Sequence, residues 1–162
     1  KLNLQSTEAI FELPENEYEV ITMWHVLEHV HALKPYLHQC YKSLKYNGRL
    51  IIAVPNYTSF DAKYYQKYWA AYDLPRHLYH FSPKAMTRLL NEIGFDLVSI
   101  RPMWYDSFYV SLLSEKYKQS GKLGMLVAGV IGLLSNLFAL KDASKGSSII
   151  YEFKKQSNTS KN

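Results

Sequence analysis

The sequence predicts an α/β fold with parallel βαβ units, because three apolar runs alternate with two helical patterns. The runs at residues 18–24, 49–54 and 95–100 have the length and composition of buried strands. Apolar residues at helical spacing occupy residues 26–44 and 83–93, between the runs. Such alternation is typical of parallel sheets, and 162 residues suffice for one domain with a buried core.

Helix boundaries in the first half are predicted from local signals. Residues 26–33 place four apolar side chains on one face, which predicts a helix directly after the first strand. Pro35 suits the first turn of a second helix, because an N–H at that position would be unpaired anyway. Asn47-Gly48 is predicted to end that helix, since Gly readily adopts the left-handed conformation of a helix cap.

The second half carries clearer capping signals. Aromatic residues over 64–72 favour a short helix, and residues 73–81 are predicted as a loop. Ser82-Pro83 is a strong helix start, with Ser as the N-cap, and Gly94 is predicted to end the helix. The remaining predictions are an amphipathic helix at 106–118 and a last strand at 147–154.

Residues 123–140 form a stretch without charge, bracketed by Lys122 and Lys141. Small residues recur at every fourth position and would let another helix approach closely, at Gly124, Ala128, Gly132 and Asn136. Three interpretations remain open for this stretch. It is a helix buried in the fold or in a dimer, a helix lying on a membrane surface, or a membrane span.

Charge is spread unevenly along the chain, which carries a formal net charge of +5. Residues 1–30 hold one basic and six acidic side chains, so the remainder holds 18 basic and 8 acidic ones. A basic remainder favours anionic small molecules or an anionic membrane surface. No block of Lys and Arg is present, so we expect no nucleic-acid partner. The single cysteine, Cys40, cannot form an internal disulfide and is predicted as a core residue of a cytoplasmic protein.

Two groups of polar side chains follow neighbouring predicted strands. His25, Glu28 and His29 come after the first strand, and Arg76 with His77 and His80 come after the second. Because the carboxyl ends of parallel strands meet at one edge of a sheet, we expect the two groups to lie together. The same residue types can transfer protons or ligate a divalent metal, and they can also be purely structural.

Other common catalytic patterns are missing from the sequence. Its seven glycines form no Gly-x-Gly-x-x-Gly segment after a strand, and no phosphate-binding loop is present. No Ser or Cys stands in the context of a nucleophile elbow. The residues alone therefore predict part of a sheet with a polar edge and without a nucleotide cradle.

Four segments together resemble class I S-adenosylmethionine-dependent methyltransferases. Residues 18–30 are similar to the family's fourth strand and the helix after it, including Val26-Leu27-Glu28-His29. Residues 44–56 are similar to its fifth strand with a terminal Pro-Asn. Residues 73–82 resemble a segment of the subgroup that methylates small molecules and lipid-like or sugar-linked substrates, and residues 82–100 match the next helix and sixth strand.

The resemblance implies a Rossmann-like, doubly wound sheet that is incomplete, with 147–154 as its antiparallel seventh strand. The family's Gly-rich cofactor loop and its ribose-binding acid precede the resembling segments and are absent here. We therefore expect a fragment, the carboxyl-terminal portion of a methyltransferase domain. It would span 1–155, with an extra helical segment at about 106–141 and a disordered tail at 156–162.

The same resemblance implies S-adenosylmethionine as the cofactor. Glu8 and Ala9 would lie beside its adenine, and Met23, Trp24 and His25 would lie along its methionine part. Some relatives hold a metal through an acid-x-x-Glu-His arrangement. His25 stands here in place of that acid, so no metal ligand is assigned.

The expected activity is methyl transfer to a small-molecule, sugar-linked or lipid-like acceptor. His25, or a histidine of the 77–80 loop, would accept the proton, and Arg76 would hold an anionic group of the acceptor.

Two alternative functions remain open. One is a non-catalytic module that binds a partner or a membrane through 123–140, and the other is a metal-dependent hydrolase that uses His25, Glu28, His29 and His80. A homodimer could cover the sheet edge left unpaired by the missing strands.

Overall fold

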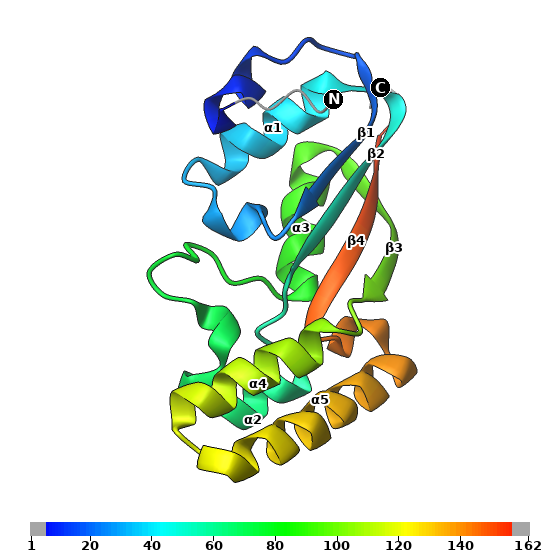
Figure 1. Cartoon of the computed structure of the whole chain (residues 1–162). Coiled ribbons are helices and arrows are strands. Elements are labelled where there is room, and N and C mark those ends of the chain that lie inside the picture. The colour runs from blue at the N-terminus through cyan, green and yellow to red at the C-terminus, as the bar shows by residue number, and fades with distance from the viewer. Residues whose placement is uncertain (1–5, 157–162) are drawn as a thin grey trace, which may run out of the picture.

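A four-stranded mixed sheet forms the frame of the molecule in the computed structural model, which describes residues 6–156 (Figure 1). The strands stand in the order β1-β2-β4-β3. Their bounds are Tyr18–Trp24 for β1, Leu44–Pro55 for β2, Phe95–Pro102 for β3 and Ser148–Lys155 for β4. The tail expected from residue 156 lies outside the described residues except for Gln156, whose backbone N–H donates to Gly94 O at 2.9 Å.

Pairing within the sheet confirms one parallel βαβ unit and places the last strand, β4, between β2 and β3. β1 runs parallel to β2, with Ile21 opposite Leu50. β4 runs antiparallel to both of its neighbours, so that Tyr151 lies opposite Ile52 on one side and opposite Ile100 on the other. β2 and β3 therefore point the same way but are separated by β4.

Helices α1 (Leu33–Ser43) and α3 (Pro83–Ile93) cover one face of this sheet. Their apolar side chains meet those of the strands in one core, which includes Leu37, Cys40, Met86, Leu90, Leu50, Ile52, Tyr151 and Phe153. The predicted caps of α3 are present, since Ser82 Oγ accepts a hydrogen bond from Ala85 N and Gly94 has a φ of 114°. Burial raises the pKa of the Cys40 thiol to about 12, which confirms a core role for this residue.

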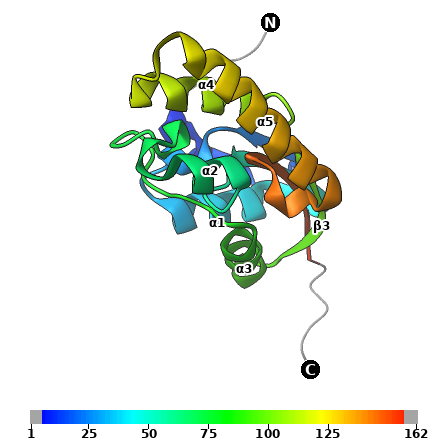
Figure 2. The same cartoon turned by 90° about the horizontal axis from the view of Figure 1, so that it is seen from below.

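Three further helices gather at one end of the sheet (Figure 1). They are α2 (Phe60–Tyr65), α4 (Asp106–Lys118) and α5 (Gly124–Lys141). In the view from below, α4 and α5 lie side by side on the side of the molecule opposite α3 (Figure 2). The helix expected over 64–72 is replaced by the end of α2 and two 3-10 turns, at Gln66–Tyr68 and Ala70–Tyr72. The remaining short 3-10 turns are Thr7–Glu12, Leu27–His29, Gly121–Leu123 and Ala143–Lys145.

The helix predicted over 26–33 does not form. Only one 3-10 turn, Leu27–His29, follows β1, and α1 begins at Leu33. The carbonyl of Glu28 accepts hydrogen bonds from the backbone N–H groups of Leu78 and Tyr79, at 2.8 and 3.3 Å. Contacts with the 73–81 loop thus occupy the carbonyl that a helix would have used, and they override the local apolar pattern.

The predicted helix end at Asn47-Gly48 is also wrong. α1 ends at Ser43, and β2 begins at Leu44, which pairs with Tyr18. Asn47 and Gly48 lie inside β2 where the register with β1 shifts, and Asn47 rather than Gly48 has the positive φ, 63°. A Cβ at Gly48 would come within 2.8 Å of Lys45 O, so a close backbone approach accounts for this glycine.

Candidate functional site

A cavity of about 290 Å³ lies where the carboxyl ends of β1 and β2 meet α4. Its polar lining comes from four separate parts of the sequence and includes His25, Asp73, Arg76, His77, Asp106, Tyr109 and Ser148. The expected meeting of the two polar groups at one sheet edge is therefore confirmed for His25, Arg76 and His77. A larger hollow of about 700 Å³ lies between α3 and β3, away from these side chains.

His25 is held between two carboxylates. Its Nδ1 lies 3.1 Å from Glu28 Oε1, and its Nε2 lies 3.0 Å from Asp106 Oδ2. The hydrogen bond to Asp106 and then that to Glu28 raise the pKa of His25 to about 9, against the opposing effect of burial. At neutral pH His25 is therefore a cation with both ring nitrogens engaged.

Asp106 is a site residue that the sequence pattern did not single out. Asp106 is the first residue of α4, where the helix dipole favours an acidic side chain. An aspartate at this position is therefore common and does not by itself indicate a functional site. Burial alone would raise the pKa of Asp106, but the His25 imidazolium and the nearby Ser148 hydroxyl outweigh it and lower the pKa. Only the fold brings α4 against the end of β1, so no local signal could have paired Asp106 with His25.

His77 has the opposite electrostatic environment from His25. Its Nδ1 lies 2.8 Å from Ala71 O, which can only accept, so Nδ1 carries the proton and Nε2 keeps a lone pair. Burial lowers the pKa of His77 below its ordinary value of 6.5. Asp73 Oδ2 is 3.7 Å from Nε2, beyond hydrogen-bond distance. At neutral pH His77 is therefore a neutral imidazole in the wall of the cavity.

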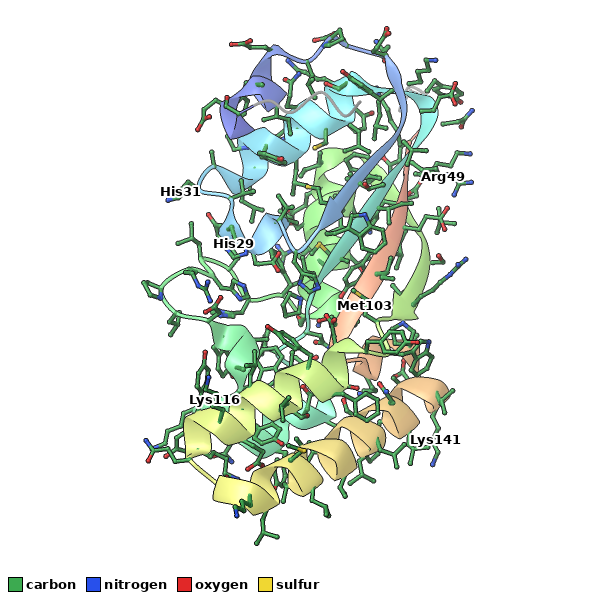
Figure 3. The ribbon with its side chains drawn as sticks, in the orientation of Figure 1. His29, His31, Arg49, Met103, Lys116 and Lys141 are labelled. Atoms are coloured by element: carbon green, nitrogen blue, oxygen red, sulfur yellow. The ribbon has the colours of Figure 1, made fainter. Side chains whose placement is uncertain are left out.

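The other predicted polar residues have mainly local partners. Nδ1 of His29, which is labelled in Figure 3, lies 3.1 Å from Arg76 O, and the His29 ring packs edge-on against His77. Nε2 of His80 lies 3.0 Å from Tyr72 O. Neither histidine lines the cavity. Arg76 lines it, but its guanidinium donates to Asp73 Oδ1 at 2.7 Å and is otherwise exposed.

One group of side chains has the composition of a metal site. Ligand atoms of Glu28, His29 and His77 lie within 4.8 Å of one another. Glu28 is buried, and its Oε2 has no hydrogen-bond partner among the described residues. The set expected for a metal-dependent hydrolase included His25 and His80, whereas the structure groups His77 with Glu28 and His29.

Of the residues predicted to contact the cofactor, His25 lines the cavity, and the others belong to β1 or to the turn before it. Glu8 and Ala9 belong to the turn Thr7–Glu12, and Glu8 lines a second cavity of about 220 Å³ with Val26 and His29. Met23 is buried in the core, so only its backbone could reach a ligand. Trp24 is 50% exposed at the end of β1. The roles of these residues in binding the cofactor stay predictions.

Comparison with known families places the chain in one of them. A family model described as a methyltransferase domain matches residues 3–100. The chain belongs to this methyltransferase family. A comparison with curated protein sequences finds no match.

Solved methyltransferases share the fold at low sequence identity. An S-adenosylmethionine-dependent methyltransferase from Thermotoga maritima superposes with a TM-score of 0.57 at 15% identity, over 89% of this chain and 59% of that one. One from Archaeoglobus fulgidus gives 0.56 at 22% identity, over 95% and 66%.

A third similar structure contains ligands. The 1,6-didemethyltoxoflavin-N1-methyltransferase of Burkholderia thailandensis, solved with that substrate and S-adenosylhomocysteine, gives a TM-score of 0.51 at 16% identity, over 91% and 48%. The chain thus has the Rossmann-like methyltransferase fold and spans less than two thirds of the length of these structures.

Proposed function

We propose that this methyltransferase chain binds the methyl acceptor in the cavity between the ends of β1, β2 and α4. The proposal rests on the observation that two histidines with different charge states line this cavity. His77 is neutral and His25 is cationic at neutral pH. A small-molecule acceptor suits the volume of about 290 Å³, and a lipid-like or sugar-linked acceptor would place its reactive end there.

S-adenosylmethionine, when bound, supplies the electrophilic methyl group. The chain's own residues hold the acceptor in line with it and take up the proton that the acceptor loses. Nε2 of His77 is the proton acceptor in this proposal, because its lone pair is available at neutral pH. His25 acts as a fixed cation beside the acceptor, since its ring nitrogens are already bound to two carboxylates.

Arg76 and the α4 side chains would select the acceptor. An anionic group of the acceptor would compete with Asp73 for the Arg76 guanidinium, which can turn because it is largely exposed. Tyr109, Leu113 and Tyr117 of α4 line the same cavity and would cover an apolar part of the acceptor. The proposed acceptor is therefore amphipathic, with an anionic group near an apolar body.

The test uses the intact enzyme, in which the upstream half of the domain is also present, and compares its methyl transfer from labelled S-adenosylmethionine with that of its His77→Ala variant. Loss of the proton acceptor should lower kcat about a hundredfold and leave the KM for S-adenosylmethionine unchanged. His38→Ala serves as the control, because His38 is an exposed residue of α1, and it should behave as wild type. An equal loss of cofactor affinity in His77→Ala would remove the proposed role.

A further inference from the structure

Helix α5 lies at the outside of the molecule (Figures 1 and 2), and many of its apolar side chains are exposed to solvent. Its outward face is the stripe of Leu126, Val130, Leu133 and Leu137, which lie one turn apart on the side away from the fold. Leu126 is 71% exposed and Leu133 is 52% exposed. Further exposed apolar side chains flank the stripe, at Leu123, Met125, Leu134, Phe138 and Leu140. A continuous exposed apolar surface of this kind marks an interaction site.

The opposite side of α5 is bound into the fold. A Cβ at Gly132 would come within 2.6 Å of Phe108 Cδ1, so α5 and α4 are in close contact. Ser135 Oγ donates a hydrogen bond of 2.7 Å to Asp61 Oδ1, and this carboxylate is fully buried. Asn136 accepts from Ser107 Oγ of α4 at 2.9 Å. A helix inserted across a membrane would lose these polar contacts, so the structure favours a helix that stays on the domain.

By length and composition alone, α5 could cross a membrane. Among residues 6–156, Gly121–Lys141 is the one helical segment long and apolar enough to do so. Its most apolar 18-residue window has a mean hydropathy of 2.1, and 33% of this window is buried. A helix of spanning hydropathy that keeps one side in a folded domain can instead lie in the plane of a membrane surface. Its free side then enters the boundary between headgroups and acyl chains.

Lysines stand at both ends of the apolar stretch. Residues 115–145 contain five Lys and two acidic residues, and one of these lysines, Lys118, lies 3.7 Å from the carboxylate of Glu115. Lys122 and Lys141 stand at the two ends of the apolar stretch, and Lys141 is labelled at the end of α5 in Figure 3. Lysines at this position relative to an apolar helix face match the anionic headgroups of a lipid surface.

We propose that the outward face of α5 docks on a membrane surface that contains anionic lipid, with the helix axis along the membrane plane. The apolar stripe would enter the headgroup boundary, and the lysines at both ends would contact the headgroups. A second copy of the chain fits this face less well. Because both ends of α5 carry Lys, parallel and antiparallel pairing would each bring like charges together.

Co-sedimentation with vesicles tests the proposal without any measurement of activity. Wild-type protein should bind vesicles of phosphatidylcholine mixed with phosphatidylglycerol, and bind vesicles of phosphatidylcholine alone at least about tenfold more weakly. Val130→Glu on the outward face should lower binding about tenfold or more, whereas Val130→Met, which keeps an apolar side chain, should retain it. Val98→Glu on β3 is the matched control, since Val98 is 48% exposed and Val130 is 50% exposed.

Two results would overturn the proposal. One is equal vesicle binding by Val130→Glu, Val98→Glu and wild type, each shown to be folded by circular dichroism. The other is a stable dimer of the wild-type protein in sedimentation equilibrium without lipid that Val130→Glu converts to monomer, which would assign the outward face to a second copy. Titration with S-adenosylhomocysteine should be unaffected by Val130→Glu, so loss of docking is distinguishable from loss of the methyltransferase site.

Discussion

At the scale of single residues, the site depends on two histidines in different environments. His25 lies between the carboxylates of Glu28 and Asp106, which favour its charged form. His77 is buried beside a backbone carbonyl, and burial favours its neutral form. One imidazole is thus suited to hold charge and the other to take up a proton.

The rate of methyl transfer should follow the ionisation of His77. The neutral form is the proton acceptor, and burial lowers the pKa of His77 below 6.5. We therefore expect kcat to rise with pH and to reach its plateau below about pH 6.5. A kcat profile of the wild-type protein from about pH 5 to pH 8 measures this. A rate that continues to rise up to pH 8 would assign the proton transfer to another group.

The stability of the fold should fall as pH rises through the pKa of His25. This pKa is about 9 in the folded protein, above its ordinary value of 6.5. The stabilisation is therefore complete below pH 6.5 and is lost as the pH rises through 9. Because His25 is 37% exposed, solvent screening limits the expected loss to about 1–2 kcal/mol.

Urea unfolding of wild type and of His25→Gln at the two ends of this pH range measures the effect. The wild-type protein should lose stability between them, and His25→Gln should lose much less. Similar losses in both proteins would contradict the assignment of the effect to His25.

Sequence patterns identified His25, Arg76 and His77 because these residues follow two apolar runs. Asp106 was not identified, since its contact with His25 depends on how α4 packs against β1 and β2. His80 was predicted as a site residue from its spacing alone. Its Nε2 lies within hydrogen-bond distance of Tyr72 O, and the residue does not line the cavity. Spacing along a loop does not determine which side chains face a cavity.

At the scale of elements, the contact between α4 and α5 depends on Gly132. Gly132→Ala would place a Cβ within 3.0 Å of Phe108 Cα and closer still to its ring. We expect this substitution to lower the free energy of unfolding by about 1–3 kcal/mol through overpacking. Gly129→Ala is the control in the same helix, because nothing lies within 4 Å of its Cβ position.

Chemical unfolding of both variants measures the difference. Gly129→Ala should raise stability by about 0.5–1 kcal/mol through the higher helix propensity of alanine. A Gly132→Ala variant as stable as Gly129→Ala would contradict the close packing of the two helices.

The bounds of α3 were predicted well from its capping signals, whereas the helix end at Asn47-Gly48 and the helix at 26–33 were wrong. Ser82 and Gly94 cap α3 as the sequence predicted. The helix expected at 26–33 is absent because the backbone of Leu78 and Tyr79 takes the carbonyl of Glu28. That competition is between residues about fifty positions apart, and no local pattern records it.

At the scale of the whole molecule, β1 is the edge of the sheet nearest the predicted cofactor residues. Val20 and Trp24 of this strand are 49% and 50% exposed. The chain covers 59% and 66% of the two most similar structures described above, so the sheet is incomplete relative to a full methyltransferase domain. A homodimer that covers this edge stays a prediction.

The alternation of strands and helices in the sequence predicted parallel strand pairing. The antiparallel direction of β4 was expected only from the family resemblance.

We propose that this chain forms the acceptor cavity of a methyltransferase domain and contributes residues to its cofactor site. To test this, S-adenosylhomocysteine would be titrated calorimetrically into this chain and into a form extended upstream by about one half-domain. We expect saturable binding to one site of the extended protein, with the same Kd for its wild-type form and its His77→Ala variant to within about twofold. Absence of binding by both folded proteins would contradict the proposed cofactor site and would favour a non-catalytic module that keeps the methyltransferase fold.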